Sequence, residues 1–178
     1  MGDLDPSIHV RRGRPDEAEA LARLHVDVWR ATYRDLAPSE AVKLLDEARR
    51  LPYWTRATTL TEAGRGVWVA DGDGTLLGVV SVGASDHPIF EGRAELKHLY
   101  VAGDAQGRGV GARLLRRAID DCQAAGDVGL ALAVVKQNAR ARRFYGKMGG
   151  IEVAEFTDAG PLWRSDNILV AWDFRSGA

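Results

Sequence analysis

Residues 99–111 read LYVAGDAQGRGVG, a run that passes from strand-like to helix-like periodicity through three alternating glycines. Glycines let backbone N–H groups converge, and at the beginning of a helix these groups and the helix dipole form a binding site for phosphate. Four arginines lie in or just after the run, at Arg108, Arg113, Arg116 and Arg117. Positive charge there opposes the helix dipole, and a bound anion would relieve that conflict. The run therefore predicts a phosphate site; the alternative is a surface loop with solvated arginines.

The chain on either side of this run alternates between strand and helix patterns. On the N-terminal side we predict a strand at 7–12, helices at 15–33 and 38–45, a weak helix around Trp54, and strands at 66–71, 76–83 and 93–101. On the C-terminal side we predict a helix at 110–126, a strand at 128–135, a helix at 138–148, and strands at 151–156 and 168–174. The Asp-Gly pairs at 71–74 predict a hairpin, and the apolar run at 128–135 predicts a strand covered by helices on both faces. The order predicts an α/β sandwich on a mixed sheet.

The composition is that of an ordinary globular domain. The 178 residues carry a net charge of -1 and are 46% hydrophobic, which argues against a dedicated nucleic-acid-binding protein. The single cysteine, Cys122, excludes an internal disulfide and a zinc site built on several thiolates, and its place on a buried helix stripe argues against thiol catalysis. No apolar run approaches the roughly 20 residues of a membrane helix, and residues 1–6 lack the basic flank and apolar stretch of a signal peptide. We therefore expect one cytoplasmic domain over residues 1–178, with no metal, nucleic-acid or membrane partner.

Three known phosphate-binding motifs compete for the glycine run. A P-loop is excluded because no Gly-Lys-Ser/Thr follows the glycines. The dinucleotide fingerprint is met superficially by Gly107, Gly109 and Ala112, but the next strand ends at Lys136 without an acidic residue for a ribose. The third pattern, Gln-x-x-Gly-x-Gly after a strand that ends in Leu-Tyr-Val, fits without adjustment.

This third pattern resembles the GNAT family of N-acetyltransferases over residues 93–155, roughly a third of the chain. The shared motifs are, in order, Ala94-Glu95-Leu96, Leu99-Tyr100-Val101, Gln106 with Gly109 and Gly111, Asn138-Ala139-Arg140-Ala141, and Phe144-Tyr145-Gly146-Lys147-Met148-Gly149. One departure is Gly150-Ile151, where the family commonly has an aromatic residue. The resemblance implies a mixed, mostly antiparallel sheet that is splayed at its centre and flanked by helices. It also implies an acetyl-CoA-binding core at 93–155 and a helical, acceptor-shaping part at 1–65.

Carried over by position, the resemblance also implies how the cofactor binds. The turn from Gln106 to Ala112 would hold the pyrophosphate of acetyl-CoA through backbone amides. The backbone of Leu99 and Val101 would bind the pantetheine arm as an added strand would, and one of its amides would polarise the thioester carbonyl. Asn138 would lie beside the pantetheine or the substrate, or would only cap its helix. The residues implied in cofactor binding are Leu99, Tyr100, Val101, Gln106, Gly107, Arg108, Gly109, Val110, Gly111, Ala112 and Asn138.

Acetyl transfer to an amine needs a base for the ammonium and an acid for the departing thiolate. Tyr145 lies seven residues after Asn138, where the family's second signature has a tyrosine. A phenol with a pKa of about 10 holds its proton at pH 7 and can give it to a thiolate. The alternative for Tyr145 is a packing role beside Phe144.

Glu95 matches the glutamate on the family's central strand and is the candidate base. It would act through water or with a raised pKa, because a carboxylate of pKa about 4 does not readily deprotonate an ammonium. Strand alternation places Glu95 with Lys97, Leu99 and Val101 on one face, and the reserve base His98 on the other. The alternative for Glu95 is an ion pair with Lys97 or an arginine.

The acceptor site is the least specified part of the sequence. His25, Trp29 and Tyr33 recur every four residues on one side of a helix, and Trp163 lies in a loop near the C-terminus. These four residues are candidates for substrate binding, and core packing is the alternative. The resemblance implies direct acetyl transfer from acetyl-CoA to a small primary amine or an amino-acid-like molecule. Protein or peptide N-acetylation and a non-catalytic acyl-CoA sensor are the rival functions, and a homodimer is suggested only by analogy with the family.

Overall fold

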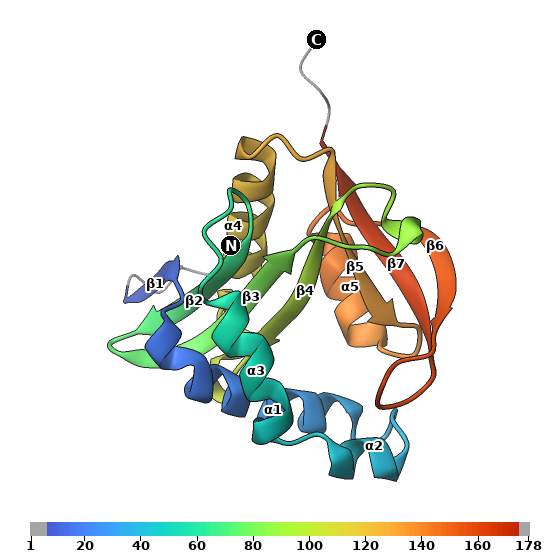
Figure 1. Ribbon diagram of the computed structural model, residues 1–178, viewed down its shortest axis with the longest axis horizontal. Coiled ribbons are helices and arrows are strands. Elements are labelled where there is room, and N and C mark those ends of the chain that lie inside the picture. Colours follow the sequence, from blue (N-terminus) through green and yellow to red (C-terminus); the bar gives the residue numbers. More distant parts are fainter. Residues whose placement is uncertain (1–6, 175–178) are drawn as a thin grey trace.

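The computed structural model describes residues 7–174 as a seven-stranded sheet with helices on both faces (Figure 1). The strands are β1 (Ile8–Arg12), β2 (Gly66–Gly72), β3 (Thr75–Gly83), β4 (Ala94–Val101), β5 (Gly129–Val135), β6 (Ile151–Asp158) and β7 (Ser165–Asp173). The helices are α1 (Ala18–Tyr33), α2 (Ser39–Leu44), α3 (Glu47–Ala57), α4 (Val110–Ala124) and α5 (Ala139–Lys147), and short 3₁₀ turns occur at Pro15–Glu17, Pro88–Phe90 and Gly103–Ala105. The predicted elements are thus confirmed, with small shifts at their ends. The expectation for residues 1–6 falls outside the described residues, and no helix within 7–174 is both long and apolar enough to cross a membrane.

The hairpin between β2 and β3 illustrates how local chemistry sets these elements. Asp73 and Gly74 both have positive φ, 52° and 81°, which is the backbone of a type I′ turn. The Asp71 carboxylate accepts a hydrogen bond from the Gly74 amide at 2.8 Å. The Asp-Gly signal in the sequence therefore predicted the hairpin correctly.

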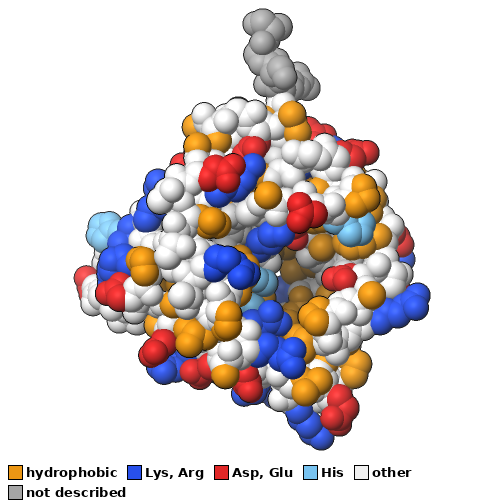
Figure 2. Space-filling model, in the orientation of Figure 1, with side chains coloured by type: hydrophobic (Ala, Val, Ile, Leu, Met, Phe, Trp, Pro, Cys, Tyr) orange, Lys and Arg blue, Asp and Glu red, His pale blue; other side chains and the backbone are white. Residues whose placement is uncertain are grey.

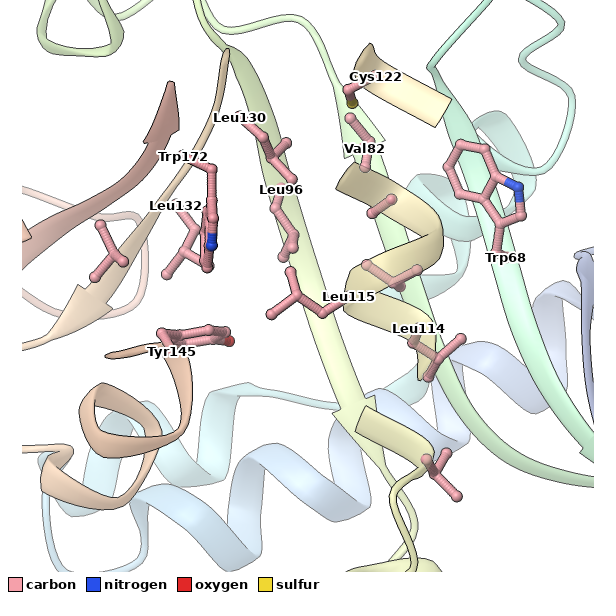
Figure 3. Packing of buried hydrophobic residues seen from close by; sticks show 14 of the residues in the cluster. Trp68, Val82, Leu96, Leu114, Leu115, Cys122, Leu130, Leu132, Tyr145 and Trp172 are labelled. Carbon is pink, nitrogen blue, oxygen red and sulfur yellow. The ribbon is translucent and has the colours of Figure 1, made fainter. Parts of the chain in front are cut away.

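Two hydrophobic clusters cover the two faces of the sheet. On one face α4 packs Leu114, Leu115, Ala118 and Cys122 against the strands, and α5 adds Tyr145 (Figure 3). On the other face α1 and α3 bury Leu21 and Trp54 against β2 and β3. Burial of this apolar area on both faces is the main force that holds the layers together.

The expectation that helices cover both faces of β5 is wrong. Leu130, Leu132 and Val134 do face the cluster of α4 and α5. On the opposite face Ala131 packs against the 3₁₀ turn at Pro88–Phe90, and Ala133 is exposed. Alanine buries little area, so this face needs no helix, and an apolar run does not distinguish the two cases.

The sheet opens at its centre, as the resemblance implied. Its strand order is β1-β2-β3-β4-β5-β7-β6, and all neighbours are antiparallel except β4 and β5. This parallel pair forms only at Ala94 with Leu130 and at Glu95 with Ala131. Beyond these positions β5 continues along β7, and the two central strands diverge (Figure 1). The fold is therefore an α/β sandwich with a mostly antiparallel, centrally splayed sheet.

An irregularity in β4 corrects the predicted distribution of its side chains. Leu96 is paired with Val82, but the next pair joins His98 to Ser81, so Lys97 is an extra residue in β4. The extra residue reverses the alternation, as β-bulges do. Leu96, Leu99 and Val101 all face the α4 side, whereas His98 and Tyr100 face α1 and α3. Glu95, which precedes the shift, lies on the face of His98, opposite to Leu99 and Val101.

Gly150, the departure from the family pattern, has a packing explanation. A Cβ atom at this position would lie 2.6 Å from Val170 Cγ1 and 2.7 Å from Trp172 Cζ2. We expect Gly150→Ala to lower the free energy of unfolding by about 1–3 kcal/mol, because overpacking displaces buried side chains. Gly146→Ala is the matched control: its Cβ would meet no atom within 4 Å, and it lies inside α5.

Gly146→Ala should raise the unfolding free energy by about 0.5–1 kcal/mol, because alanine loses less backbone entropy in a helix. Urea denaturation of the two variants and the wild type measures both effects. Equal stability of the two variants would contradict the packing explanation.

Candidate functional site

A cavity of about 450 Å³ lies where β4 and β5 diverge. Its wall is built from the end of α1, the end of β4, the middle of β5, the beginning of α4 and the inner side of α5. The predicted residues that line it are Tyr33, Leu99, Tyr100, Val101, Gln106, Gly107, Gly109, Val110, Gly111, Ala112, Asn138 and Tyr145. The predicted residues that are not part of its lining are His25, Trp29, Glu95, Arg108 and Trp163. The splay thus brings most of the candidate cofactor residues together around one space.

Sequence reasoning did not identify several further lining residues. Leu132, Ala133 and Val134 contribute from β5, and Thr32 from the last turn of α1. His98, expected as a reserve base, also lines the cavity, as does Lys97. The β5 residues were recognisable only as an apolar strand, because nothing in the sequence says where that strand leaves its neighbour. A parallel pair of such short extent is a tertiary feature.

The glycine turn presents backbone amides to one end of the cavity. Gly107 and Gly109 have φ values of 79° and 78°, a left-handed conformation that favours glycine. Gly109 is the N-cap of α4 and has no side chain to satisfy the first amides of the helix. These amides also lack a carbonyl one turn earlier, so an anion is a suitable partner for them.

The side chain of Gln106 holds this turn in place. Its Nε2 donates to the carbonyl of Val101 at 3.1 Å, and its Oε1 accepts from Arg140 Nη2 at 2.8 Å. Gln106 therefore ties the turn to the end of β4 and to α5, and it fixes the position of the amides. Several arginines near the turn have protein partners instead: Arg113 with the Ile8 carbonyl, Arg117 with Asp121, and Arg142 with Glu152.

Asn138 caps α5, as predicted, and also lines the cavity. Its Oδ1 accepts a hydrogen bond from the Ala141 amide at 3.2 Å. Burial raises the pKa of the Tyr33 phenol, and a hydrogen bond with Asn138 opposes that shift. Asn138 therefore connects the beginning of α5 to the end of α1 across the cavity.

Tyr145 extends from α5 toward β4 with its hydroxyl group leading (Figure 3). The residue is 9% exposed, and its ring packs against Phe144 and Trp172 with centroids 5.2 and 6.1 Å away. Its hydroxyl makes no hydrogen bond with another residue of the described range, 7–174. Burial raises the pKa of this phenol, so it is protonated at neutral pH. Tyr145 thus offers an uncommitted proton at the cavity wall.

Glu95 is engaged with a neighbour. Its carboxylate forms a short ion pair with Lys97, the partner named as the alternative to a base role. Lys97 lines the cavity and Glu95 does not. A proton from the cavity would therefore reach Glu95 only through Lys97 or through water.

A chain of hydrogen-bonded side chains lies on the face of β4 that packs against α1 and α3. Trp54 Nε1 donates to His25 Nδ1 at 3.3 Å, and because an indole only donates, neutral His25 carries its hydrogen on Nε2. That nitrogen lies 3.3 Å from the Tyr100 hydroxyl, which in turn lies 3.4 Å from His98 Nδ1. Burial holds the pKa of His25 at about 2 and that of His98 at about 3, so both rings are neutral. Neutral His98 therefore carries its hydrogen on Nε2, because Nδ1 accepts from Tyr100. A nitrogen that already carries a hydrogen cannot accept a proton, so Nε2 is a poor candidate for the general base.

The predicted acceptor residues divide between core and cavity. His25 is buried within the hydrogen-bonded chain described above, and Trp29 packs with Val26 and Leu45. Tyr33 lines the cavity, and Trp163 contacts it with ring centroids 6.2 Å apart. Only the last turn of the predicted aromatic stripe therefore reaches the cavity.

Comparison with known sequences identifies the family. The acetyltransferase (GNAT) family profile matches residues 23–150, which include the splayed strands, the glycine turn and α5. The chain belongs to the GNAT family. This GNAT chain is 27% identical over 146 residues to a probable N-acetyltransferase of Mycobacterium tuberculosis, covering 81% of the chain and 80% of the relative. It is 32% identical over 109 residues to an L-amino acid N-acyltransferase of Escherichia coli, covering 60% of the chain and 61% of the relative.

Comparison with solved structures shows that the fold is shared with known N-acetyltransferases. The PaiA N-acetyltransferase of Thermoplasma acidophilum, crystallised with coenzyme A, superimposes with a TM-score of 0.76 at 21% identity. The superposition covers 94% of this chain and 99% of that protein. Within residues 7–174 no group of three or more His, Cys, Asp or Glu side chains is placed to hold a metal ion.

Proposed function

We propose that this protein is an acetyl-CoA-dependent N-acetyltransferase that acts on a primary amine by direct transfer. The observation that carries the proposal is the continuity of one cavity, from the amide-rich beginning of α4, along the open edge of β4, to the free hydroxyl of Tyr145. The structural relative crystallised with coenzyme A supports the same reading.

The residues present suit acetyl-CoA at each part of its length. The amides of the turn from Gln106 to Ala112 would hold the pyrophosphate, because helix N-termini bind anions. The edge of β4 at Leu99 and Val101 has no strand partner on the β5 side, and an amide-containing arm can add to such an edge. Asn138 would lie beside that arm.

Bound acetyl-CoA would supply an acetyl group activated as a thioester. The acceptor nitrogen forms the new C–N bond as the C–S bond breaks, and Tyr145 would give its hydroxyl proton to the departing sulfur. Glu95 would receive the proton lost by the ammonium through water, since its ion pair with Lys97 keeps it away from the cavity. A backbone amide of residues 99–101 would stabilise the charge that develops on the carbonyl oxygen.

Direct transfer is favoured over a thiol-bound intermediate. Cys122 is fully buried under α4, does not line the cavity, and has a pKa that burial raises to about 12. A thiol with that pKa provides almost no thiolate at neutral pH. The acceptor would be a small amine or an amino-acid-like molecule, in line with the Escherichia coli relative. The free hydroxyl of Tyr145 speaks against a purely sensory role.

Calorimetric titration tests the proposed cofactor. Acetyl-CoA should bind with a clear heat signal, whereas NAD and ATP at the same concentrations should give none, because the site lacks the ribose-binding acid and the P-loop lysine of their motifs. Tight binding of NAD without a response to acetyl-CoA would overturn the proposal. Thiol release in the presence of an amine then measures transfer itself, and its complete absence with every amine would support the sensor alternative.

A further inference from the structure

Arg50 on α3 is a half-buried cation that no protein group neutralises. It makes no hydrogen bond or ion pair with another residue in the range 7–174, and its Nε atom is buried without a partner. The other half-buried arginines in this range each bind a carboxylate or a backbone carbonyl: Arg11, Arg65, Arg93, Arg113, Arg117 and Arg142. Burial lowers the pKa of Arg50, which means that its surroundings disfavour its charge. Arg50 is thus the exception among the half-buried arginines of residues 7–174, because it has neither kind of partner.

Arg50 does not itself line the cavity, but it lies on the side of α3 that packs against two lining residues, His98 and Tyr100. It lies close enough to His98 and Tyr100, which line the cavity, for its charge to shift the pKa of both. Trp54, one turn further along α3, contacts His98 and so shows that this side of the helix faces β4. On the surface, lysine and arginine side chains gather around a central hollow in which a histidine is visible (Figure 2).

No carboxylate near Arg50 is available to it. Asp46 caps the beginning of α3 by accepting the Arg49 amide, and Glu47 pairs with Arg23. Glu95, the acid on this face of β4, is bound by Lys97. The two histidines of this face are neutral, as derived above. One positive charge therefore remains uncompensated at this end of the cavity.

His98 adds a hydrogen-bond donor beside this charge. The chain that begins at Trp54 leaves the hydrogen of His98 on Nε2, and this atom has no partner within the described part of the chain. A guanidinium and a neutral imidazole N–H together suit the two oxygens of a carboxylate. A second ammonium at the same place would be repelled.

We propose that Arg50 and His98 form a carboxylate subsite, so that the acceptor is an amine that carries a carboxylate close to its nitrogen, as a free amino acid does. This inference rests on the proposed function, because it names the acceptor of the same cavity. It separates free amino acids from peptide N-termini, whose nearest carboxyl group is blocked as an amide. Arg50 acts here as a substrate-binding residue and takes no part in proton transfer.

The test uses four amines that share one side chain: leucine, leucinamide, leucyl-glycine and 3-methylbutylamine. Thiol release from acetyl-CoA gives kcat/KM for each. The wild type should use leucine at least ~10-fold better than the other three, because only leucine carries a carboxylate on the carbon that bears its amine; the carboxylate of leucyl-glycine lies a whole residue further away. Arg50→Gln should raise KM for leucine by roughly 10- to 100-fold, the usual effect of losing a hydrogen bond to a charged group, and change the other three by less than about 3-fold.

Two further variants sharpen the result. Arg49→Gln removes the same charge from an exposed neighbour on α3 and should leave all four values unchanged. Arg50→Lys should recover part of the leucine activity, since lysine restores the charge without the fork of the guanidinium. Equal losses on all four amines, or a wild-type preference for leucinamide or leucyl-glycine, would overturn the carboxylate subsite.

The outcomes distinguish this inference from the proposed function. Lack of acetyl-CoA binding would remove the proposed function, whereas acetylation of all four amines without a preference would remove only the subsite. If acetyl-CoA binds and none of the four reacts, binding of N-acetyl-leucine and N-acetyl-leucinamide to the CoA-loaded protein replaces the rate measurement. Equal affinity for these two compounds, or an affinity for N-acetyl-leucine that Arg50→Gln leaves intact, would also overturn the subsite.

Discussion

Tyr145→Phe is expected to lower kcat by about 10- to 100-fold while the dissociation constant of acetyl-CoA changes by less than about 3-fold. The reason is that the substitution removes only the hydroxyl group. That group has no hydrogen-bond partner within residues 7–174, so no protein group is left unpaired. The ring keeps its contacts with Phe144 and Trp172. Stopped-flow or steady-state thiol release gives kcat, and calorimetry gives the affinity.

Tyr53→Phe is the matched control. Tyr53 is also a phenol on the inner side of a helix, but its hydroxyl bonds to Ser81 at 2.8 Å and it does not line the cavity. Its loss should reduce stability slightly and leave kcat unchanged, because only a structural hydrogen bond disappears. An unchanged kcat for Tyr145→Phe would remove the acid role from Tyr145.

The pH dependence offers an independent readout of the same residue. Burial raises the pKa of Tyr145 above the usual value of a phenol, so the proton is present throughout the neutral range and is lost only at higher pH. Deprotonation of Tyr145 should therefore cause no loss of activity up to at least about pH 9. An alkaline decline below that pH belongs to another group, and it should persist in Tyr145→Phe.

Periodicity and turn chemistry predicted the elements of this fold because each depends on neighbours in sequence. The hairpin at Asp73-Gly74 requires two residues that tolerate positive φ, and the cap at Asn138 requires a side-chain oxygen before a helix. The splayed sheet came from the family resemblance. In the splay itself the pairing of β4 with β5 ends after Glu95, which no local pattern marks.

The errors have the same physical origin. Strand alternation assumes one residue per position, and the extra residue Lys97 reverses the faces of β4 without altering its composition. The helical spacing of His25, Trp29 and Tyr33 correctly groups them on one side of α1. The first two residues are buried in the core, however, and only Tyr33 lines the cavity. Whether an aromatic residue packs or binds depends on where its helix crosses the sheet, which is a tertiary property. The sequence did not single out Arg50 for the same reason, because only the folded structure shows that its guanidinium has no partner.

The second large effect concerns the glycine turn. Gly109→Val is expected to weaken acetyl-CoA binding by at least ~100-fold. Gly109 has a φ of 78°, and a β-branched residue in that conformation costs about 1–3 kcal/mol of strain. Relief of the strain rotates the amides at the beginning of α4 away from the anion, and each charge-assisted hydrogen bond lost costs about 1.5–3 kcal/mol. Because the turn is exposed, the folded structure should survive with a small decrease in melting temperature.

The control for this variant lies six residues earlier in the same loop. Gly103→Ala adds a methyl group that would meet no atom within 4 Å, at a position with no positive φ and no place in the cavity lining, so binding should be unchanged. S-acetylpantetheine, which lacks the pyrophosphate, separates the turn from the rest of the site. If the turn holds the pyrophosphate, Gly109→Val should reduce kcat/KM for acetyl-CoA toward the value for S-acetylpantetheine and leave the latter nearly unaltered. Equal losses with both thioesters would mean that the valine disturbs the open edge of β4, and the pyrophosphate would then have to bind elsewhere.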